Sequence, residues 1–312
     1  MNIESLLEQL RNIFGDRLKE QEPLARYTSA RIGGPAEALL SVSSKEELVL
    51  VMQKLWESDV PYRLLGGGSN ILVSDAGVPG VVVLNQARKV HFTNSHTPSV
   101  WAESGAHLSK VARQAGKRGL GGLEWAAGIP GTVGGAVVGN AGAHGGEISS
   151  SLILAEILHC NEGQQFWEPP RFEFGYRSSL FKRQPRQGVV LTAQLRLEHK
   201  SVEEVEATMQ EFDEHRRRTQ PRGPSMGSMF KNPPGDSAGR LIDAAGLKGT
   251  RVGDAEISEV HANFFINRGK ATAADVWSLI QLARQKIKEQ FGVRLELEIE
   301  LIGVWDEEQK QL

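Results

Sequence analysis

The chain has 312 residues, 40% of them hydrophobic and 24% charged, which is typical of a globular protein with two or three domains. A net charge of −2 gives no electrostatic reason to expect a nucleic-acid partner, and no apolar run is long enough to span a bilayer. The N-terminal segment lacks the apolar core of a signal peptide, and the single cysteine, Cys160, excludes an internal disulfide. We therefore expect a cytoplasmic protein, and a monomer, since nothing in the sequence demands a second copy.

Hydrophobic periodicity and capping residues predict the regular elements in chain order. Helical spacing of apolar residues predicts a leading helix over 3–14, residues 25–38 are expected to form a loop, and Ser44 with Glu47 forms a capping box. The expected helices after this capping box lie at 45–58, 108–118, 201–219, 237–245 and 273–291. The expected strands lie at 62–65, 71–73, 81–84, 152–159, 189–198, 261–267 and 294–302.

A glycine-rich stretch, GIPGTVGGAVVGNAGAHGGEI at 128–148, is the most unusual part of the sequence. Glycine loses the most backbone freedom on folding, so a run this dense is unfavourable for an ordinary helix or strand. It also carries few charges, which argues against a solvated linker. A backbone that bends sharply and presses bare N–H groups against a phosphate satisfies both observations. A plain flexible loop is the alternative reading.

A second glycine loop, Gly66-Gly67-Gly68-Ser69-Asn70, lies between the strands expected at 62–65 and 71–73. It is not a Walker loop, because no Gly-Lys-Ser/Thr follows it, and it is not the GxGxxG fingerprint, because no helix opens after it. Two such loops together suggest a large, extended ligand that carries phosphate.

Three further segments place polar residues in turns or between apolar neighbours. Arg177 follows a Gly-Tyr turn and can present its planar fork to a carboxylate or phosphate, although it is also readable as a surface arginine. Ser228 stands beside Gly227 without a GxSxG elbow, so it is either a general acid held by its neighbours or an ordinary turn serine. The last expected strand alternates glutamates with apolar residues. Without further information, this row of glutamates is typical of the solvent-exposed edge of a sheet.

Spacing alone selects none of the three glutamates, which are Glu296, Glu298 and Glu300. It also gives no metal site, since no histidine pair has helical ligand spacing and no HExxH occurs.

Taken together, several segments of the sequence resemble the UDP-N-acetylenolpyruvoylglucosamine reductase family. The enzymes of this family act in the cytoplasmic synthesis of peptidoglycan precursors. The matching segments occur in the family's order and span nearly the whole chain: LLGGGSNILVSD at 64–75, GLEWAAGIPGTVGGAVVGNAGAHGGEI at 122–148, FGYRSSLFK at 174–182, GSMFKNPPGDSAGRLIDAAGLKG at 227–249, VHANFFINRGKATAADV at 260–276 and FGVRLELEIELIG at 291–303. Their ordered combination is far more specific than any one of them.

The resemblance implies an α+β fold with an FAD-binding domain of the PCMH type, similar to vanillyl-alcohol oxidase, and a smaller substrate domain. The implied boundaries are 20–198 for the FAD-binding domain with two subdomains, 199–292 for the substrate domain, and 293–312 for a C-terminal strand that returns to the active site. It also implies FAD as cofactor and NADPH as co-substrate. Hydride then passes from flavin N5 to the enolpyruvyl methylene of UDP-N-acetylglucosamine enolpyruvate, and a proton gives UDP-N-acetylmuramate.

The same resemblance assigns site residues. Arg177, Ser228 and Glu298 match the family's active-site arginine, proton donor and glutamate, so only the resemblance singles out Glu298. The implied substrate contacts are Tyr176, Lys231 and Asn232. The implied FAD contacts are Gly66, Gly67, Gly68, Ser69, Asn70, Gly128, Ile129, Pro130, Gly131, Thr132, Gly134, Gly135, Asn140, Ala141 and Gly142.

The chain departs from the family's pattern in three respects. His144 stands where a tyrosine-like aromatic is expected, and Gly139 where a larger apolar residue is common. The segment after Arg177 also runs directly into the strand expected at 189–198, as in a shorter subtype without an added tyrosine loop. Two other functions stay open at this stage: an FAD-dependent oxidase of the same fold, and a nucleotide-sugar-binding regulator that has lost catalysis.

Overall fold

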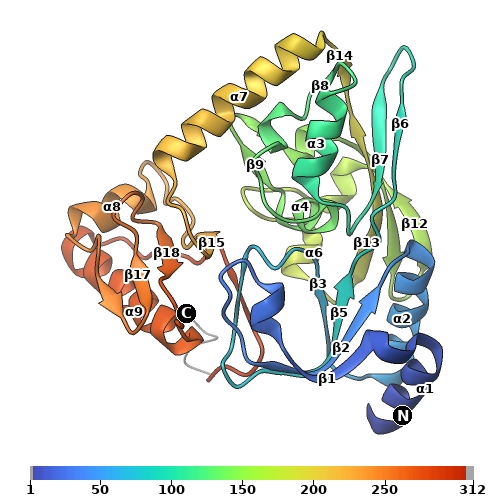
Figure 1. Ribbon diagram of the computed structural model, residues 1–312, viewed down its shortest axis with the longest axis horizontal. Helices are drawn as coiled ribbons and strands as arrows, with labels where there is room; N and C mark the ends of the chain where they lie inside the picture. The colour runs from blue at the N-terminus through green and yellow to red at the C-terminus, as the bar shows by residue number, and fades with distance from the viewer. Residues whose placement is uncertain (1–2, 307–312) are drawn as a thin grey trace. The chain divides into compact units, whose positions relative to one another are not determined.

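The computed structural model describes residues 3–306, which form two compact units (Figure 1). Unit 1 contains the residues up to 18 together with 40–67 and 83–216, and unit 2 contains 19–39, 68–82 and the residues from 217 onward. The domain boundaries expected from the sequence stay a prediction, and residues 307–312 of the expected C-terminal segment lie outside the described residues.

The chain passes between the units within strands of one sheet. This four-stranded sheet has the order β1-β2-β5-β3, and the unit boundaries at 18/19, 39/40 and 82/83 fall inside β1, β2 and β5. Its strands are β1 (Leu18–Pro23), β2 (Pro35–Val42), β3 (Tyr62–Leu65) and β5 (Val78–Asn85). The expected loop over 25–38 was therefore wrong in its last part, where Pro35 begins a mostly buried strand.

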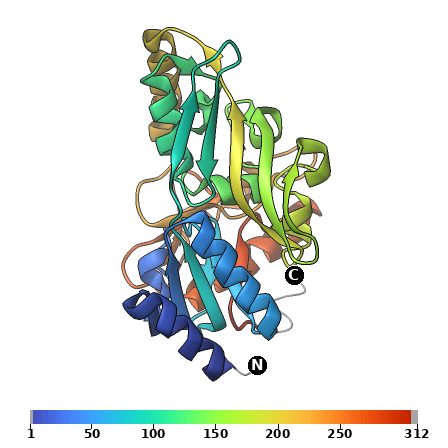
Figure 2. The same cartoon turned by 90° about the vertical axis from the view of Figure 1, so that its right-hand side faces the viewer.

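Unit 1 is built on a five-stranded antiparallel sheet in the order β12-β11-β13-β7-β6, whose strands Figure 2 shows side by side. The strands are β6 (Val90–Thr93), β7 (Ser99–Glu103), β11 (Leu152–His159), β12 (Gly163–Trp167) and β13 (Gly188–Arg196). Two short pairs accompany them: β8 (Leu120–Gly121) with β14 (Glu198–His199), and β9 (Gly142–Ala143) with β10 (Gly146–Glu147).

Helices cover this sheet and complete the core of unit 1. Apolar strand residues such as Val100 and Leu195 pack with Val111 and Val137 from two of the helices. The helices are α1 (Ile3–Phe14), α2 (Lys45–Ser58), α3 (Leu108–Gly116), α4 (Val133–Gly139), α5 (Ile148–Ser151), α6 (Leu180–Arg183) and α7 (Val202–Thr219), with 3₁₀ turns at η1 (Gly15–Arg17), η3 (Glu124–Ala126) and η4 (Pro169–Phe172). Helix α7 continues past residue 216 into unit 2.

The glycine-rich stretch contains a helix that its composition did not predict. Residues 133–139 form α4, capped at its start by Thr132, whose hydroxyl accepts the N–H of Gly135, and at its end by Asn140 in the left-handed conformation. A Cβ on Gly134 would lie 2.8 Å from the Cβ of Ser104, so this glycine lets the helix approach β7 and its following turn. Glycine is therefore selected here by close packing and not by an absence of regular structure.

Unit 2 is a small α+β unit around a four-stranded antiparallel sheet in the order β15-β18-β17-β16. Its core joins the sheet, including Phe265, to apolar faces of two helices, with Leu241 and Ile280 among the buried residues. The elements are η2 (Leu24–Tyr27), β4 (Ile71–Val73), β15 (Ser225–Ser228), α8 (Ala238–Ala244), β16 (Arg251–Val252), β17 (Ala255–Ile257), β18 (Phe264–Asn267), α9 (Ala273–Phe291) and β19 (Glu300–Ile302).

The C-terminal strand expected over 294–302 is shorter than its alternation predicts. Only β19 is a regular strand, and it pairs in parallel with β4. Upstream, Leu297 forms an isolated antiparallel bridge with Phe230. The segment therefore changes partner between Leu297 and Glu300, and this break in the ladder ends the regular strand even though the alternation of apolar and polar residues continues.

The other expected elements and the α+β class are confirmed, with shifts of a few residues at their ends. The capping residues explain this accuracy. The Ser44 hydroxyl accepts the N–H of Glu47, the Ser201 hydroxyl accepts the N–H of Glu204, and Thr272 forms a reciprocal capping box with Asp275. Within residues 3–306, no helix is long and apolar enough to cross a membrane.

Glu47 anchors the start of α2 and gives a pH-dependent prediction. Its carboxylate accepts hydrogen bonds from Ser43 N at 2.7 Å and from the Arg17 guanidinium at 2.8 and 2.9 Å. The Arg17 hydrogen bonds lower the pKa of Glu47 from 4.5 to about 2, so their stabilisation is complete above about pH 4.5 and is lost as the pH falls toward 2. Glu47→Gln should reduce the free energy of unfolding by about 1 kcal/mol at pH 7.

Urea unfolding of Glu47→Gln and wild-type protein between pH 7 and pH 3 measures this difference. The difference in the free energy of unfolding between Glu47→Gln and wild type should decrease as the pH falls. Glu57→Gln, on the same helix, should have the same free energy of unfolding as wild type. A difference that stays constant with pH would contradict the assignment.

Candidate active site

The two glycine loops meet within unit 1. A Cβ on Gly66 would lie 2.5 Å from the hydroxyl of Thr132, and one on Gly67 would lie 2.8 Å from the Cα of Gly131. No residue with a side chain fits at either position without displacing the other loop. The two loops therefore form one continuous surface of backbone, which exposes peptide groups to a ligand where side chains would otherwise lie.

Gly68 closes the same turn within unit 2. It has a φ of +59°, and a Cβ there would lie 2.0 Å from the carbonyl oxygen of Tyr27. Asn70, two residues on, makes two bonds within the protein: its side-chain amide donates to the carbonyl of Glu298 at 3.1 Å, and its backbone carbonyl accepts the N–H of Glu300 at 3.0 Å. Asn70 therefore positions the Glu298 segment, whatever contact its backbone makes with a ligand.

The end of the glycine-rich stretch folds into a tight hairpin. Strands β9 and β10 are joined by His144 and Gly145, both with positive φ, as a type I′ turn requires. The His144 ring stacks on Phe212 of α7 at a centroid distance of 4.1 Å and an interplanar angle of 8°. Burial and the neighbouring His215 and Arg216 lower the pKa of His144, so its ring is neutral at pH 7. The unusual histidine is therefore an aromatic packing residue.

Gly139, the second departure, has room for a side chain. It is the last residue of α4, and no atom lies within 4 Å of a Cβ placed there. Gly139→Ala should therefore raise the free energy of unfolding by about 0.5–1 kcal/mol, because alanine costs less backbone entropy in a helix. Thermal unfolding measures the change. Gly134→Ala, which must displace Ser104, is the matched variant and should lower the melting temperature; a lower melting temperature for Gly139→Ala would be the contrary result.

The turn that carries Arg177 is fastened to the glycine-rich stretch. The buried Asn140 side chain donates to the carbonyl of Gly175 at 3.1 Å, and the buried Ser179 hydroxyl donates to the carbonyl of Val138 at 2.6 Å. Gly175 and Ser178 also exchange both backbone hydrogen bonds, at 3.0 and 3.1 Å. These bonds fix the turn relative to α4. They also explain why Asn140 and Ser179, which are both buried, are polar.

Arg177 itself lies in the left-handed region, with a φ of 53°. That conformation costs a non-glycine residue about 1 kcal/mol or more, and the surrounding hydrogen bonds maintain it. The guanidinium lies 5.4 Å from the centre of the Tyr176 ring, which is 55% exposed. The turn thus presents a half-buried cation and a phenol together, as a site for an anionic group requires.

In unit 2, Ser228 and Glu298 are brought to neighbouring chain segments. Ser228 ends β15, and the next residue, Met229, accepts the N–H of Glu298 through its carbonyl at 3.0 Å. Two residues further, the N–H of Lys231 donates to the carbonyl of Glu296 at 2.9 Å. These antiparallel contacts place the expected proton donor and the expected glutamate in one local structure, and Arg177 belongs to unit 1.

The three glutamates are not equivalent in the structure. Glu296 is 73% exposed at its side chain and forms an ion pair with Lys231 at 3.3 Å, and Glu300 is exposed on β19. Glu298 between them is half-buried and is held through its backbone by Met229 and Asn70. Packing therefore separates Glu298 from the other two, which alternation alone could not do.

Asn263 organises this region and was missed in the sequence. Its buried side chain donates to the carbonyl of Phe230 at 2.8 Å and accepts the Phe230 N–H at 2.9 Å, and its backbone carbonyl accepts the Met229 N–H at 2.7 Å. The polar side chains of His261, Asn263 and Asn267 among the apolar residues of the HANFFIN segment were the available signal, since a buried amide must be paired.

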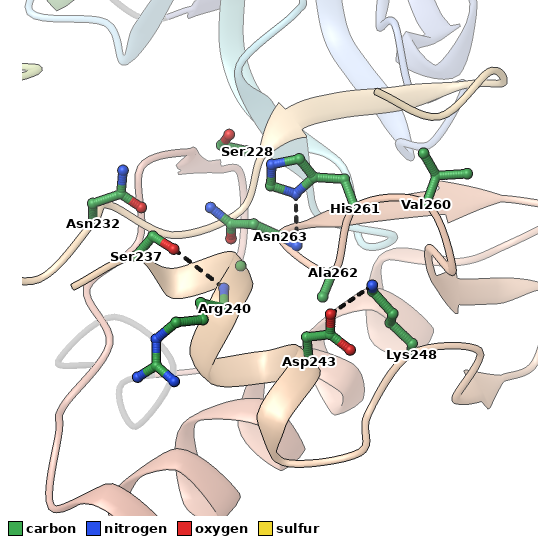
Figure 3. A pocket seen from close by; sticks show the side chains of 11 residues that line it. Ser228, Asn232, Ser237, Arg240, Asp243, Lys248, Val260, His261, Ala262 and Asn263 are labelled. Atoms are coloured by element: carbon green, nitrogen blue, oxygen red, sulfur yellow. Dashed lines mark hydrogen bonds and ion pairs between the residues drawn. The ribbon is translucent and has the colours of Figure 1, made fainter. Parts of the chain in front are cut away.

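A cavity of about 390 Å³ opens beside Ser228, entirely within unit 2 (Figure 3). Its lining combines hydroxyls, amides and cations from the end of β15, from α8 and the residues on both sides of it, and from the turn before β18: Ser228, Asn232, Ser237, Gly239, Arg240, Asp243, Lys248, Val260, His261, Ala262 and Asn263. Of the expected substrate contacts, Asn232 lines the cavity and also accepts the N–H of Ala238 at 3.1 Å. Lys231 is paired with Glu296 instead of lining it.

The charges in the cavity are balanced in pairs. Lys248 lies 2.6 Å from Asp243, and Arg240 pairs with Asp236, whose pKa falls to about 2 chiefly through the Arg240 hydrogen bonds. Burial lowers the pKa of His261, and the nearby Lys248 charge adds to that effect. The cavity therefore combines two cations, each paired with an aspartate, with several neutral donors, a set that suits a polar ligand with phosphate groups.

Comparisons with known proteins assign the chain to a family. A model described as the UDP-N-acetylenolpyruvoylglucosamine reductase C-terminal domain matches residues 219–302, and one described as an FAD binding domain matches 36–165. The UDP-N-acetylenolpyruvoylglucosamine reductase of Chloroflexus aggregans is 43% identical over 290 residues, which cover 91% of this chain and 97% of that protein. The chain belongs to the UDP-N-acetylenolpyruvoylglucosamine reductase family.

Two further relatives agree with this assignment. The enzyme of the same name from Bacillus subtilis is 39% identical over 96% of this chain and 99% of its own length. The crystal structure of UDP-N-acetylenolpyruvylglucosamine reductase from Thermus caldophilus superposes with a TM-score of 0.77 at 39% identity, covering 91% of this chain and 98% of that one. The expected α+β fold with an FAD-binding PCMH-type domain is thereby confirmed.

FAD is the cofactor of the family, and the residues of this chain fit it. Gly66 and Gly67 lie so close to Thr132 and Gly131 that side chains are excluded at these two positions. The backbone N–H groups of the loops are therefore available as donors to a pyrophosphate. The hydroxyls of Ser69 and Thr132 belong to the same two loops. NADPH is the co-substrate.

Proposed function

We propose that the chain is an NADPH-dependent oxidoreductase that reduces UDP-N-acetylglucosamine enolpyruvate to UDP-N-acetylmuramate, a step of peptidoglycan precursor synthesis. When bound, FAD supplies the hydride that NADPH has delivered to it. The residues of the chain then bind the enol ether, orient it, and provide the proton that completes the reduction. The observation that carries this proposal is the hydrogen bond from the Glu298 N–H to the carbonyl of Met229, the residue after Ser228, beside a cavity suited to a nucleotide sugar.

Arg177 acts on the carboxylate of the enolpyruvyl group. Hydride addition to the methylene places carbanion-like charge on the carbon next to that carboxylate, and only a site that stabilises this charge accelerates the step. A guanidinium matches a carboxylate with two parallel N–H donors. The fixed turn from Gly175 to Ser178 holds this fork in place, so little reorganisation is needed when the charge develops.

Ser228 delivers the proton. Its Oγ–H bond breaks as the new C–H bond forms at the carbon next to the carboxylate, and the electron pair left on Oγ takes a proton from solvent. The backbone bonds of Met229 and Phe230 to Asn263 fix the position of this hydroxyl. Glu298 contacts the enolpyruvyl end of the substrate with its carboxyl group, which can hold or release a proton. Its neighbours Glu296 and Glu300 are exposed.

The remaining expected contacts complete the proposal. Asn232 binds substrate from the cavity wall, and Tyr176 and Lys231 contact polar groups of the substrate. FAD is held by the backbone of the two glycine loops, with Asn70 and Asn140 acting mainly through the segments that their side chains fasten. The chain works as a monomer in the cytoplasm, with the domains at 20–198, 199–292 and 293–312.

Steady-state oxidation of NADPH by the FAD-loaded protein tests the proposal. With UDP-N-acetylglucosamine enolpyruvate, one molecule of UDP-N-acetylmuramate should form for each NADPH consumed, as measured by absorbance and mass spectrometry. Rapid re-oxidation by oxygen without that substrate would identify a flavin oxidase instead. Binding of the nucleotide sugar without NADPH consumption would identify a regulator.

A further inference from the structure

His261 lies in the turn before β18 and lines the same cavity as Ser228 (Figure 3). The backbone N–H groups of Val260 and His261 both donate to the buried Ser258 hydroxyl, at 3.1 and 3.3 Å, which fixes the turn that carries the ring. Two neighbours limit the ring itself. Phe264 packs edge-on at 5.0 Å, and Gly239 leaves space for it, since a Cβ there would lie 2.9 Å from His261 Cε1.

One hydrogen bond determines which ring nitrogen carries the proton. The backbone N–H of Asn263 donates to Nδ1 of His261 at 3.2 Å, so Nδ1 must be the unprotonated acceptor. Burial lowers the pKa of His261, which keeps the ring neutral at pH 7. A neutral imidazole carries a proton on only one of its two ring nitrogens, and in His261 this nitrogen is therefore Nε2. His261 is a hydrogen-bond donor, and not an acceptor, toward the cavity.

The free edge of the ring lies on the side of Ser228. Figure 3 shows Nδ1 directed to the Asn263 backbone and Nε2 on the opposite side of the ring, where the Ser228 side chain enters the cavity. Ser228 at the end of β15 is paired with Phe264, the first residue of β18, and His261 lies in the turn that leads into this strand.

We propose that His261 is a positioning residue for proton delivery: its Nε2–H donates to Ser228 Oγ and directs the Ser228 O–H toward the substrate carbon. Because the imidazole cannot accept the Ser228 proton at Nε2, that proton stays available for transfer. As the Oγ–H bond breaks, the same Nε2–H stabilises the oxygen left behind, which compensates for the weak acidity of a serine hydroxyl. This inference rests on the proposed role of Ser228 as the proton donor.

Two substitutions separate this role from a structural one. His261→Gln places an amide N–H near the position of Nε2, whereas His261→Asn keeps an oxygen near Nδ1 for the Asn263 N–H and has nothing at Nε2. Stopped-flow absorbance measures each half-reaction of the FAD-loaded enzyme: reduction by NADPH, and re-oxidation by UDP-N-acetylglucosamine enolpyruvate. His261→Asn should slow re-oxidation by about 10- to 100-fold with reduction unchanged, and His261→Gln should recover most of that loss.

Gly239→Ala gives an independent test, because its Cβ displaces the ring without changing its chemistry, and it should slow re-oxidation like His261→Asn. In the wild type, nitrogen NMR of the histidine rings should find the proton of His261 on Nε2. The proposal is overturned by a proton on Nδ1, or by full re-oxidation rates in His261→Asn with a loss in His261→Gln. A wild-type enzyme that this substrate does not re-oxidise overturns the proposed function as well.

Discussion

Ser228→Ala should leave the reduction of bound FAD by NADPH at the wild-type rate and slow re-oxidation by UDP-N-acetylglucosamine enolpyruvate by about 10²- to 10⁴-fold. The reason is local. Ser228 ends β15 at the cavity, and its hydroxyl is the proposed source of the proton that follows hydride transfer. The backbone bonds from Asn263 hold Met229 and Phe230 whether or not the hydroxyl is present, so the substitution should not disturb the fold.

Single-turnover absorbance measurements separate the two half-reactions of this variant. Ser225→Ala, at the other end of β15 and outside the cavity lining, is the matched control and should behave as wild type in both. Slow reduction by NADPH with normal re-oxidation would contradict the role given to Ser228, because the defect would then precede proton delivery.

Glu298→Gln should lose turnover by about 10²-fold or more while retaining FAD. Glutamine has the size of glutamate, and the backbone bonds to Met229 and Asn70 do not depend on the side chain. The change removes only the ability of the carboxyl group to hold and release a proton. The glutamate row supplies its own controls, since Glu296 and Glu300 are exposed neighbours on the same segment.

Steady-state turnover and FAD content of the three glutamine variants test this assignment. Glu296→Gln should change turnover little, apart from the loss of its exposed ion pair with Lys231, and Glu300→Gln should be close to wild type. Full activity in Glu298→Gln together with loss in either neighbour would move the role to that neighbour.

Local signals in the sequence predicted most of the fold. The capping residues Ser44, Ser201 and Thr272 fix helix starts through bonds within four residues, so α2, α7 and α9 were found closely. Helix α4 was not predicted, because its glycines are required by a tertiary contact: Gly134 lies against Ser104, thirty residues away in the chain. The end of the last strand was missed for the same kind of reason, since its partners, Phe230 and β4, are distant in sequence.

The sequence indicated candidate site residues through backbone conformation and through the resemblance, and the roles given to them stay predictions. The close contact between Gly66 and Thr132 agrees with the expectation that both glycine loops serve one extended ligand. Spacing could not distinguish Glu298 from its neighbours, because that difference comes from burial. The contribution of Asn263 was equally hidden, since its hydrogen bonds to Phe230 join segments 33 residues apart.

The most direct test of the proposed reaction is the visible absorption spectrum of the purified protein under anaerobic conditions, recorded before and after the addition of NADPH and then of UDP-N-acetylglucosamine enolpyruvate. We expect oxidised-flavin bands that bleach with NADPH and return when UDP-N-acetylglucosamine enolpyruvate is added, with UDP-N-acetylmuramate as the product. A colourless protein that takes up no added FAD would contradict the reading of both glycine loops. A flavin that bleaches with NADPH and stays reduced after the enol ether is added would contradict the proposed reaction.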